Sequence, residues 1–251
     1  MKVISARYLI GNAIRRFRRE AELLGSLEHP GICRIYQADT GAVGGDRIPF
    51  IAMEFVRGEP LDIAARGMTI PERIEVVARV CDAVEHAHRL GVVHRDLKPA
   101  NILVESVQSG GVRIANPKIL DFGVARLLDE PDGVVCTMAG QLVGTFQYMS
   151  PEQFDGAAPS ASSDVYSIGV MLYEVLVGRR PFDRSPNAAF ASRPAGRSAP
   201  AIRRLPRDLG RDLDVIVQKA LEADPSRRYL SAKDLAADLR RFRLGLPVEA
   251  Q

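Results

Sequence analysis

The sequence is poor in cysteine and contains no long apolar run. Its three cysteines, Cys33, Cys81 and Cys136, lie far apart and form no Cys-x-x-Cys pair. This argues against a zinc knuckle or a disulfide framework, and a reducing cytoplasm is the expected compartment. The N-terminus lacks the apolar segment of a signal peptide. The longest apolar run, Ile168 to Val177, is interrupted by Glu174 and is too short to cross a bilayer, so we expect a buried helix there and no membrane segment.

The chain also lacks a strong excess of charge of either sign. Its 251 residues include 34 basic and 31 acidic side chains, which gives a net charge of +3. That balance is too weak to indicate a nucleic-acid-binding surface. With 46% hydrophobic and 26% charged residues, the composition is that of a globular protein long enough for one large domain or two lobes that share a core.

Hydrophobic periodicity predicts a small β-containing first part and a mainly helical second part. The first part is expected to contain an amphipathic helix over 14–27 and two strands, Ile32 to Ala38 and Pro49 to Val56, joined by a glycine-rich turn. Short strand-like runs alternate with polar turns between Val92 and Asp129. Helices are expected at 70–90, 163–178, 211–223 and 231–243, and a loop at 184–201. This order is typical of an α+β fold with segregated elements.

Residues that could carry chemistry occur as three motifs in a fixed order. They are His94-Arg95-Asp96-Leu97-Lys98-Pro99-Ala100-Asn101, then Asp121-Phe122-Gly123, then Gly144-Thr145 with Ser150-Pro151-Glu152. Each motif alone is most often a solvated turn or a bend, but the three together are very specific. They resemble the catalytic loop, the metal-binding triplet and the end of the activation segment of a protein kinase.

The resemblance covers nearly the whole chain and is greatest to bacterial serine/threonine kinases of the eukaryotic-like (Hanks) type. It implies a bilobal α+β fold over 1–251, with a partial small lobe at 1–56 and a helical lobe at 57–251. It also implies transfer of the γ-phosphate of ATP to Ser/Thr hydroxyls of protein substrates, with ATP and Mg²⁺ as cofactors.

The resemblance assigns roles to the residues of the motifs. Asp96 would accept the proton of the substrate hydroxyl, and Asn101 and Asp121 offer the hard oxygen ligands that suit Mg²⁺. Lys98 would steady the transferring phosphoryl group, and a lysine here indicates Ser/Thr rather than Tyr acceptors. Thr145 matches the family's threonine that bonds the catalytic aspartate and lysine.

A nucleotide base is expected at the strand that connects the lobes. The backbone of Glu54 and Val56 would bond the edge of the adenine, Met53 would be the gatekeeper behind it, and Leu103 would pack beneath it. For Met53 and Leu103, ordinary core packing explains the residue type equally well.

Other matched positions imply structural roles. Asp164 would be a buried anchor for the backbone of the catalytic loop, and Glu152 would form a buried ion pair with Arg228. An apolar column that aligns the two lobes is expected from Leu24, Ile35, His94 and Phe122.

A regulatory role is expected for Arg95. In the family such an arginine pairs with a phosphorylated residue of the activation loop, and Thr137 is the best acceptor between Leu127 and Val143. Autophosphorylation at Thr137 is therefore one interpretation, and an ordinary solvated threonine is the other.

The sequence departs from the family at its start, where no Gly-x-Gly-x-x-Gly loop occurs. Lys2 stands eighteen residues before Glu20, a spacing that fits the family's phosphate-pairing lysine and the glutamate of its first long helix. We therefore expect the chain to begin inside the family's third strand, without the first two strands and the glycine-rich loop. Two alternatives stay open: a truncated form of an active kinase, or a catalytically weak domain that binds partners. A zinc hydrolase is disfavoured because the four histidines form no ligand pattern.

Overall fold

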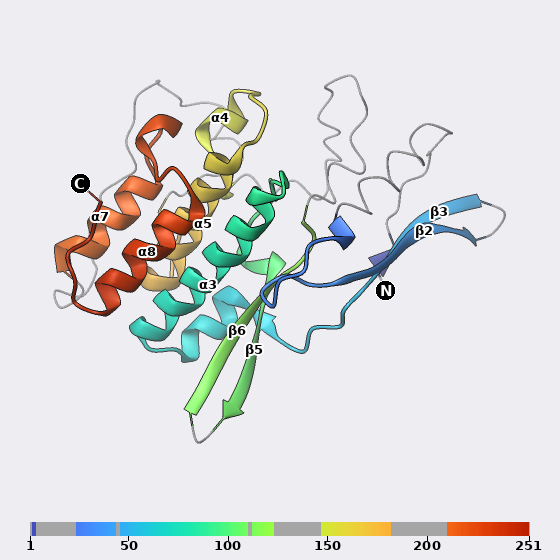
Figure 1. Ribbon diagram of the computed structural model, residues 1–251, viewed down its shortest axis with the longest axis horizontal. Coiled ribbons are helices and arrows are strands. Elements are labelled where there is room, and N and C mark those ends of the chain that lie inside the picture. Colours follow the sequence, from blue (N-terminus) through green and yellow to red (C-terminus); the bar gives the residue numbers. More distant parts are fainter. Residues whose placement is uncertain are drawn as a thin grey trace.

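The computed structural model describes residues 2–3, 24–43, 46–109, 112–122, 147–181 and 210–250. Figure 1 shows most of the helices on one side of the molecule and the β2–β3 hairpin on the other. The strands precede most of the helices in the chain, so the predicted α+β class is confirmed. The elements are β1 (Lys2–Val3), β2 (Ile35–Val43), β3 (Asp46–Met53), β4 (Glu59–Pro60), α2 (Leu61–Ala64), η1 (Ala65–Gly67), α3 (Ile70–Arg89), η2 (Pro99–Asn101), β5 (Ile102–Ser109), β6 (Val112–Ile119), α4 (Pro151–Phe154), α5 (Ala161–Val177), α7 (Gly210–Ala220), η6 (Pro225–Arg227) and α8 (Ala232–Arg243).

The first sheet is antiparallel, in the order β1-β3-β2. The two predicted strands exist, but their predicted bounds were wrong. Pairing continues from Ile35 opposite Met53 to Val43 opposite Asp46, so both strands run into the segment predicted as a turn. Strand β2 begins later than predicted because Ile32 instead forms an isolated parallel bridge with Ile119 of the other sheet.

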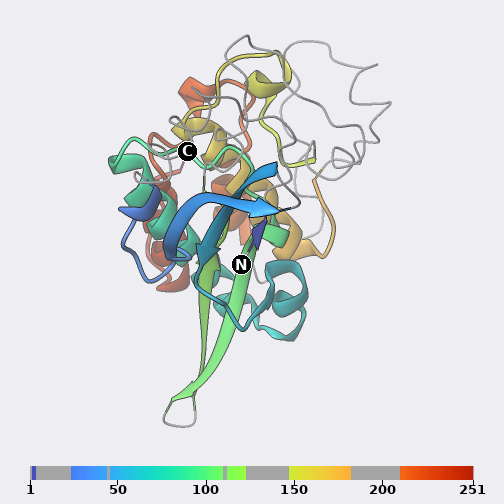
Figure 2. The ribbon, with the colours of Figure 1, turned by 90° about the vertical axis from the view of Figure 1, so that its right-hand side faces the viewer.

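The second sheet has the order β4-β5-β6 and contains a long hairpin. Strands β5 and β6 are paired over their full eight residues each, and the hairpin extends away from the helices (Figures 1 and 2). The sequence predicted only short strands here. Gly58 sits where the chain passes closest to this sheet: a Cβ atom on it would lie 2.8 Å from the Val104 backbone, which only a glycine avoids.

Helix α3 confirms the predicted helix at 70–90. Thr69 and Glu72 form a reciprocal capping box, and Pro71 occupies the first turn, where its missing N–H costs nothing. The predicted apolar face is fully buried and includes Ile74, Val77, Val80, Cys81, Val84 and Ala87.

Helix α5 is the buried helix expected from the apolar run. Nearly all of its side chains are buried, which is the pattern of a helix surrounded by other elements. Gly169 lets α7 approach closely, because a Cβ atom there would lie 2.9 Å from the Cβ of Ala220. Glu174, the charged residue in this run, accepts a 2.5 Å hydrogen bond from the Tyr148 hydroxyl. No helix among the described residues combines the length and the apolar character that crossing a bilayer requires.

The remaining sequence predictions for the fold divide into two groups. Helices α7 and α8 match the predictions at 211–223 and 231–243 within three residues at each end. The loop predicted at 184–201 and most of the helix predicted at 14–27 lie outside the described residues.

Candidate active site

The backbone at the start of the predicted catalytic loop is held by one buried carboxylate. Asp164, in the first turn of α5, is 1% exposed. Its carboxylate accepts hydrogen bonds from the backbone N–H of His94 at 2.8 Å and of Arg95 at 2.9 Å, and its Oδ2 lies 2.7 Å from His88 Nε2 of α3. Arg95 has a φ of 72°, a conformation that is costly for a residue with a side chain, and these bonds help to hold it.

Two predicted catalytic residues, Lys98 and Asn101, donate hydrogen bonds to a third, Asp96. Lys98 Nζ donates to Asp96 Oδ2 at 2.7 Å. Asn101, at the end of η2, donates from Nδ2 to the Asp96 carbonyl at 2.8 Å and to Oδ2 at 3.3 Å. Asp96 and Lys98 keep 32% and 24% of their side chains exposed, so the carboxylate is fixed in place and still reachable from solvent.

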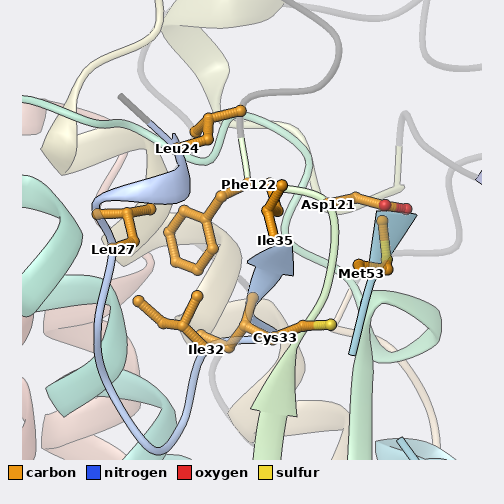
Figure 3. A pocket seen from close by; sticks show the side chains of 9 residues that line it. Leu24, Leu27, Ile32, Cys33, Ile35, Met53, Asp121 and Phe122 are labelled. Carbon is orange, nitrogen blue, oxygen red and sulfur yellow. The ribbon is translucent and has the colours of Figure 1, made fainter. Parts of the chain in front are cut away.

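The predicted metal ligands lie on connected segments. The N–H of Leu120 donates to the Asn101 carbonyl at 2.8 Å, which places the end of β6 beside η2, and Asp121 follows directly. Figure 3 shows the Asp121 carboxylate extending toward Met53, while the ring of Phe122 points the other way. The side-chain nitrogen of Asn101 donates to Asp96, and its side-chain oxygen is the atom that could bind a cation. An amide oxygen and a carboxylate suit a divalent cation such as Mg²⁺, so the residues present fit one.

The residues of the predicted apolar column lie in one region of the structure. The rings of His94 and Phe122 lie 4.7 Å apart, and His94 Nε2 is 2.9 Å from the Leu120 carbonyl. Leu24, Ile35 and Phe122 line one small cavity (Figure 3). The other residues around this cavity are Leu27, Ile32, Cys33, Met53, Ile119 and Asp121.

The segment predicted to bind the base follows β3. Met53 is the last residue of that strand, and its side chain lines the cavity. Val56 is buried, whereas Phe55 is 82% exposed. Leu103 lies on β5, directly opposite Lys118 of β6. The Glu54 carboxylate accepts hydrogen bonds from Lys118 Nζ at 2.6 and 2.7 Å.

Lys118 is the residue near this segment whose contact the sequence reasoning missed. Its partner is 64 positions away in the chain, beyond the reach of local pattern. The available signal was a lysine between two apolar residues, Pro117 and Ile119, because a charge in such a place needs a partner. Burial alone would raise the pKa of Glu54, but the bonds from Lys118 and the Arg34 backbone hold it below its ordinary value.

The predicted ion pair between Glu152 and Arg228 is present. Arg228 Nη1 and Nη2 each donate to a different Glu152 oxygen at 2.7 Å, and the Arg228 side chain is fully buried. Ser163 also donates to Glu152 at 2.9 Å. Burial opposes ionisation of Glu152, but these donors outweigh it and lower its pKa to about 2.

Several predicted site residues are only partly described or not described. Lys2 lies in β1, opposite Ile51 of β3, and only its backbone is described. Glu20, Thr137 and Thr145 lie outside the described residues. The Arg95 carbonyl lies 3.4 Å from Gln153 Nε2, which donates to it.

Comparison with known proteins gives consistent matches over this chain. Residues 1–238 match the family model described as "Protein kinase domain". The chain is 40% identical over 240 residues to the serine/threonine-protein kinase PknB of Mycobacterium tuberculosis, covering 94% of this chain and 37% of that protein. It is 36% identical over 230 residues to the serine/threonine-protein kinase PrkC of Bacillus subtilis, covering 90% of this chain and 33% of that protein. The chain thus spans about a third of the length of the curated relatives it matches.

Proposed function

Because this chain belongs to the protein kinase family, whose bilobal α+β fold it has, we propose that it transfers the γ-phosphate of ATP to Ser and Thr hydroxyls of protein substrates. The observation that carries the proposal is the cluster in which Lys98 and Asn101 both donate to Asp96. Phosphoryl transfer depends mainly on positioning and charge stabilisation, and this cluster offers both beside a reachable carboxylate.

In the proposed reaction, Asp96 orients the acceptor hydroxyl and receives its proton. The hydroxyl oxygen forms a bond to the γ-phosphorus while the bond from that phosphorus to the bridging oxygen of ADP breaks. Lys98, 2.7 Å from Asp96, places a positive charge beside the transferring group. Thr145 is proposed to bond Asp96 and Lys98, as its position in the motif implies.

The proposed cofactors are ATP and Mg²⁺, with Asn101 and Asp121 as the protein ligands of the metal. When bound, the cation supplies positive charge against the phosphate oxygens. Asn101 is suited to this because η2 and its bonds to Asp96 fix its orientation.

The rest of the nucleotide is proposed to lie between the two sheets. Met53, Glu54 and Val56 would meet the base, with Leu103 beneath it. Lys2 and Glu20 are proposed to pair near the phosphates, and the strand position of Lys2 beside β3 supports this. In this proposal residues 1–56 form the small lobe and residues 57–251 the helical lobe.

Activation-loop autophosphorylation is the proposed regulation, with Thr137 as acceptor and Arg95 as the cation that binds the phosphate. Thr137→Ala should then abolish incorporation of phosphate into the isolated protein and lower its activity toward added substrates. Unchanged activity with unchanged phosphate content, measured by intact mass and by transfer assay, would remove this part of the proposal.

The main test is phosphoryl transfer by Asp96→Asn. The variant keeps the shape of the side chain but removes the proton acceptor, so the rate of transfer from ATP to a protein substrate should fall by about 10²- to 10⁴-fold. Asp212→Asn, at an exposed position of α7, is the matched control and should keep the parent rate. Transfer by Asp96→Asn at the parent rate would contradict the role of Asp96. A parent protein that is folded yet gives no thermal shift with Mg-ATP would favour a partner-binding domain instead.

A further inference from the structure

The end of strand β3 is fixed to the second sheet by a partly buried ion pair. Lys118 Nζ donates to both carboxylate oxygens of Glu54, and the two side chains are only 17% and 26% exposed. Charge-assisted bonds of this length, partly removed from solvent, are stronger than those of an exposed pair. The pair therefore adds a side-chain link between the end of β3 and the second sheet, close to the backbone bonds that Ile119 forms with Gly31 and Cys33.

Lys118 is itself held on a rigid strand. Its neighbour Ile119 donates from its N–H to the Gly31 carbonyl at 2.8 Å and accepts from the N–H of Cys33 at 2.9 Å. Across the hairpin, Lys118 lies opposite Leu103, so their side chains occupy the same face of the sheet. The lysine thus stands beside the proposed floor of the base site and reaches from there to Glu54.

Glu54 is held through both its side chain and its backbone, whereas the side chain that follows it is exposed. Its carboxylate also accepts from the N–H of Arg34 at 3.2 Å, and its own N–H donates to the Arg34 carbonyl at 2.8 Å. Its carbonyl oxygen accepts a bond from Cys33 Sγ at 3.4 Å, a weak donor that leaves room for a second one. The next residue, Phe55, has 82% of its surface exposed.

We propose that the Lys118–Glu54 pair is a positioning device for recognition of the adenine amino group. It fixes Glu54 so that its carbonyl presents the acceptor to that group, and Lys118 is a positioning residue that never touches the nucleotide. The inference rests on the proposed nucleotide site, and it adds a residue that discriminates between bases without contacting them.

The test compares two nucleotides in two variants. Inosine diphosphate carries a carbonyl oxygen where adenosine diphosphate carries the amino group, so it cannot donate to the Glu54 carbonyl. Binding of each to the parent protein, Lys118→Met and Glu54→Gln is measured by titration calorimetry with magnesium present. In both variants the Kd for adenosine diphosphate should rise about three- to tenfold, and that for inosine diphosphate by less than about twofold. The double variant should bind no more weakly than either single variant, because the two side chains act as one unit.

Two further variants make the result specific. Lys118→Arg keeps a cation at this place and should restore most of the preference for adenosine diphosphate. Glu28→Gln breaks the neighbouring exposed pair with Arg34, whose atoms are 3.2 Å apart, and should leave both dissociation constants unchanged. If Lys118→Met does not fold, Glu54→Gln is judged by the same criterion, since it keeps the shape of the side chain.

The unfavourable outcomes are distinct from one another. Variants that bind adenosine diphosphate as tightly as the parent protein overturn the inference, and so does an equal loss for both nucleotides, which indicates general damage. A parent protein that binds neither nucleotide removes the proposed function itself, and the inference falls with it.

Discussion

Asp164 and Glu54 are carboxylates that each tie a functional segment to a neighbouring element, but they do so in different surroundings. Asp164 is 1% exposed and receives two backbone N–H groups while it also contacts His88. Glu54 is 26% exposed and receives one lysine and one backbone N–H. The first carboxylate lies in the helical core, and the second lies where two small sheets meet.

The difference concerns what each carboxylate is able to control. A buried carboxylate with several donors cannot lose one partner without leaving a charge or a donor unsatisfied, so it fixes a single backbone conformation. A partly exposed pair can be replaced by water at modest cost, so it biases a position rather than imposing it. We therefore expect the stability of the protein to depend mainly on the helical core, whereas the proposed positioning of the nucleotide depends on the Lys118–Glu54 pair.

The largest expected effect on stability is that of Asp164→Asn. The amide removes the charge and can accept only one of the two backbone bonds at full strength, so the free energy of unfolding should fall by about 3 kcal/mol or more. Urea denaturation measures this, with Asp212→Asn as the control at an exposed position. A loss below about 0.5 kcal/mol would show that the loop is held by something other than Asp164.

The next effect is a pH dependence that comes from Glu152. Its folded-state pKa is about 2, below the ordinary value of 4.5, so its contribution to stability is complete above about pH 5 and is lost as the pH falls toward 2. The full contribution is about 3 kcal/mol at neutral pH. The difference in unfolding free energy between the parent protein and Glu152→Gln should thus shrink by roughly half between pH 7 and pH 3.

A constant difference between the parent protein and Glu152→Gln across that range would show that the ion pair does not set the pKa of Glu152. The same measurement on Glu54→Gln tests the region where the two sheets meet. The pKa of Glu54 is also lowered, so any pH dependence from this residue should have the same sign.

The smallest expected effect is that of Lys118→Met on stability. The pair is partly exposed and Glu54 keeps its bond from the Arg34 backbone, so the free energy of unfolding should fall by only about 1 kcal/mol. Urea denaturation of this variant beside Asp164→Asn makes the comparison direct. If both variants lose the same free energy of unfolding, the two carboxylates contribute equally to stability and the proposed difference between the regions is wrong.

The sequence was most informative where local pattern decides the structure. The apolar spacing of Ile74, Val77, Val80 and Val84 predicted α3 closely, because a helix closes its hydrogen bonds within itself and needs only a buried face. The strand bounds were less predictable, since a strand continues for as long as its partner pairs with it. Gln108 and Arg113 are not typical strand residues, yet they pair opposite one another within the β5–β6 hairpin.

The contacts of the candidate site were also predictable where the residues are close in sequence and less so where they are far apart. Motif order identified Asp96, Lys98 and Asn101 as neighbours, and they do meet, because they lie within six consecutive residues. The Glu152–Arg228 pair, at a separation of 76, was predictable only through resemblance to a family. The contact of Lys118 was not predicted, because no motif includes this lysine and its partner Glu54 lies 64 positions away, just after strand β3.

Asp164 fixes the position of the catalytic loop through backbone groups, so the position of the loop does not depend on the side chains that give it its chemistry. Asp164 binds the amide groups of His94 and Arg95, which every residue except proline possesses, and does not bind the Arg95 side chain through these contacts. The geometry of this turn is thereby largely insensitive to the chemical identity of its side chains. A designer could exchange Arg95 for another residue that tolerates a positive φ and expect the backbone to stay in place, provided that the buried carboxylate remains.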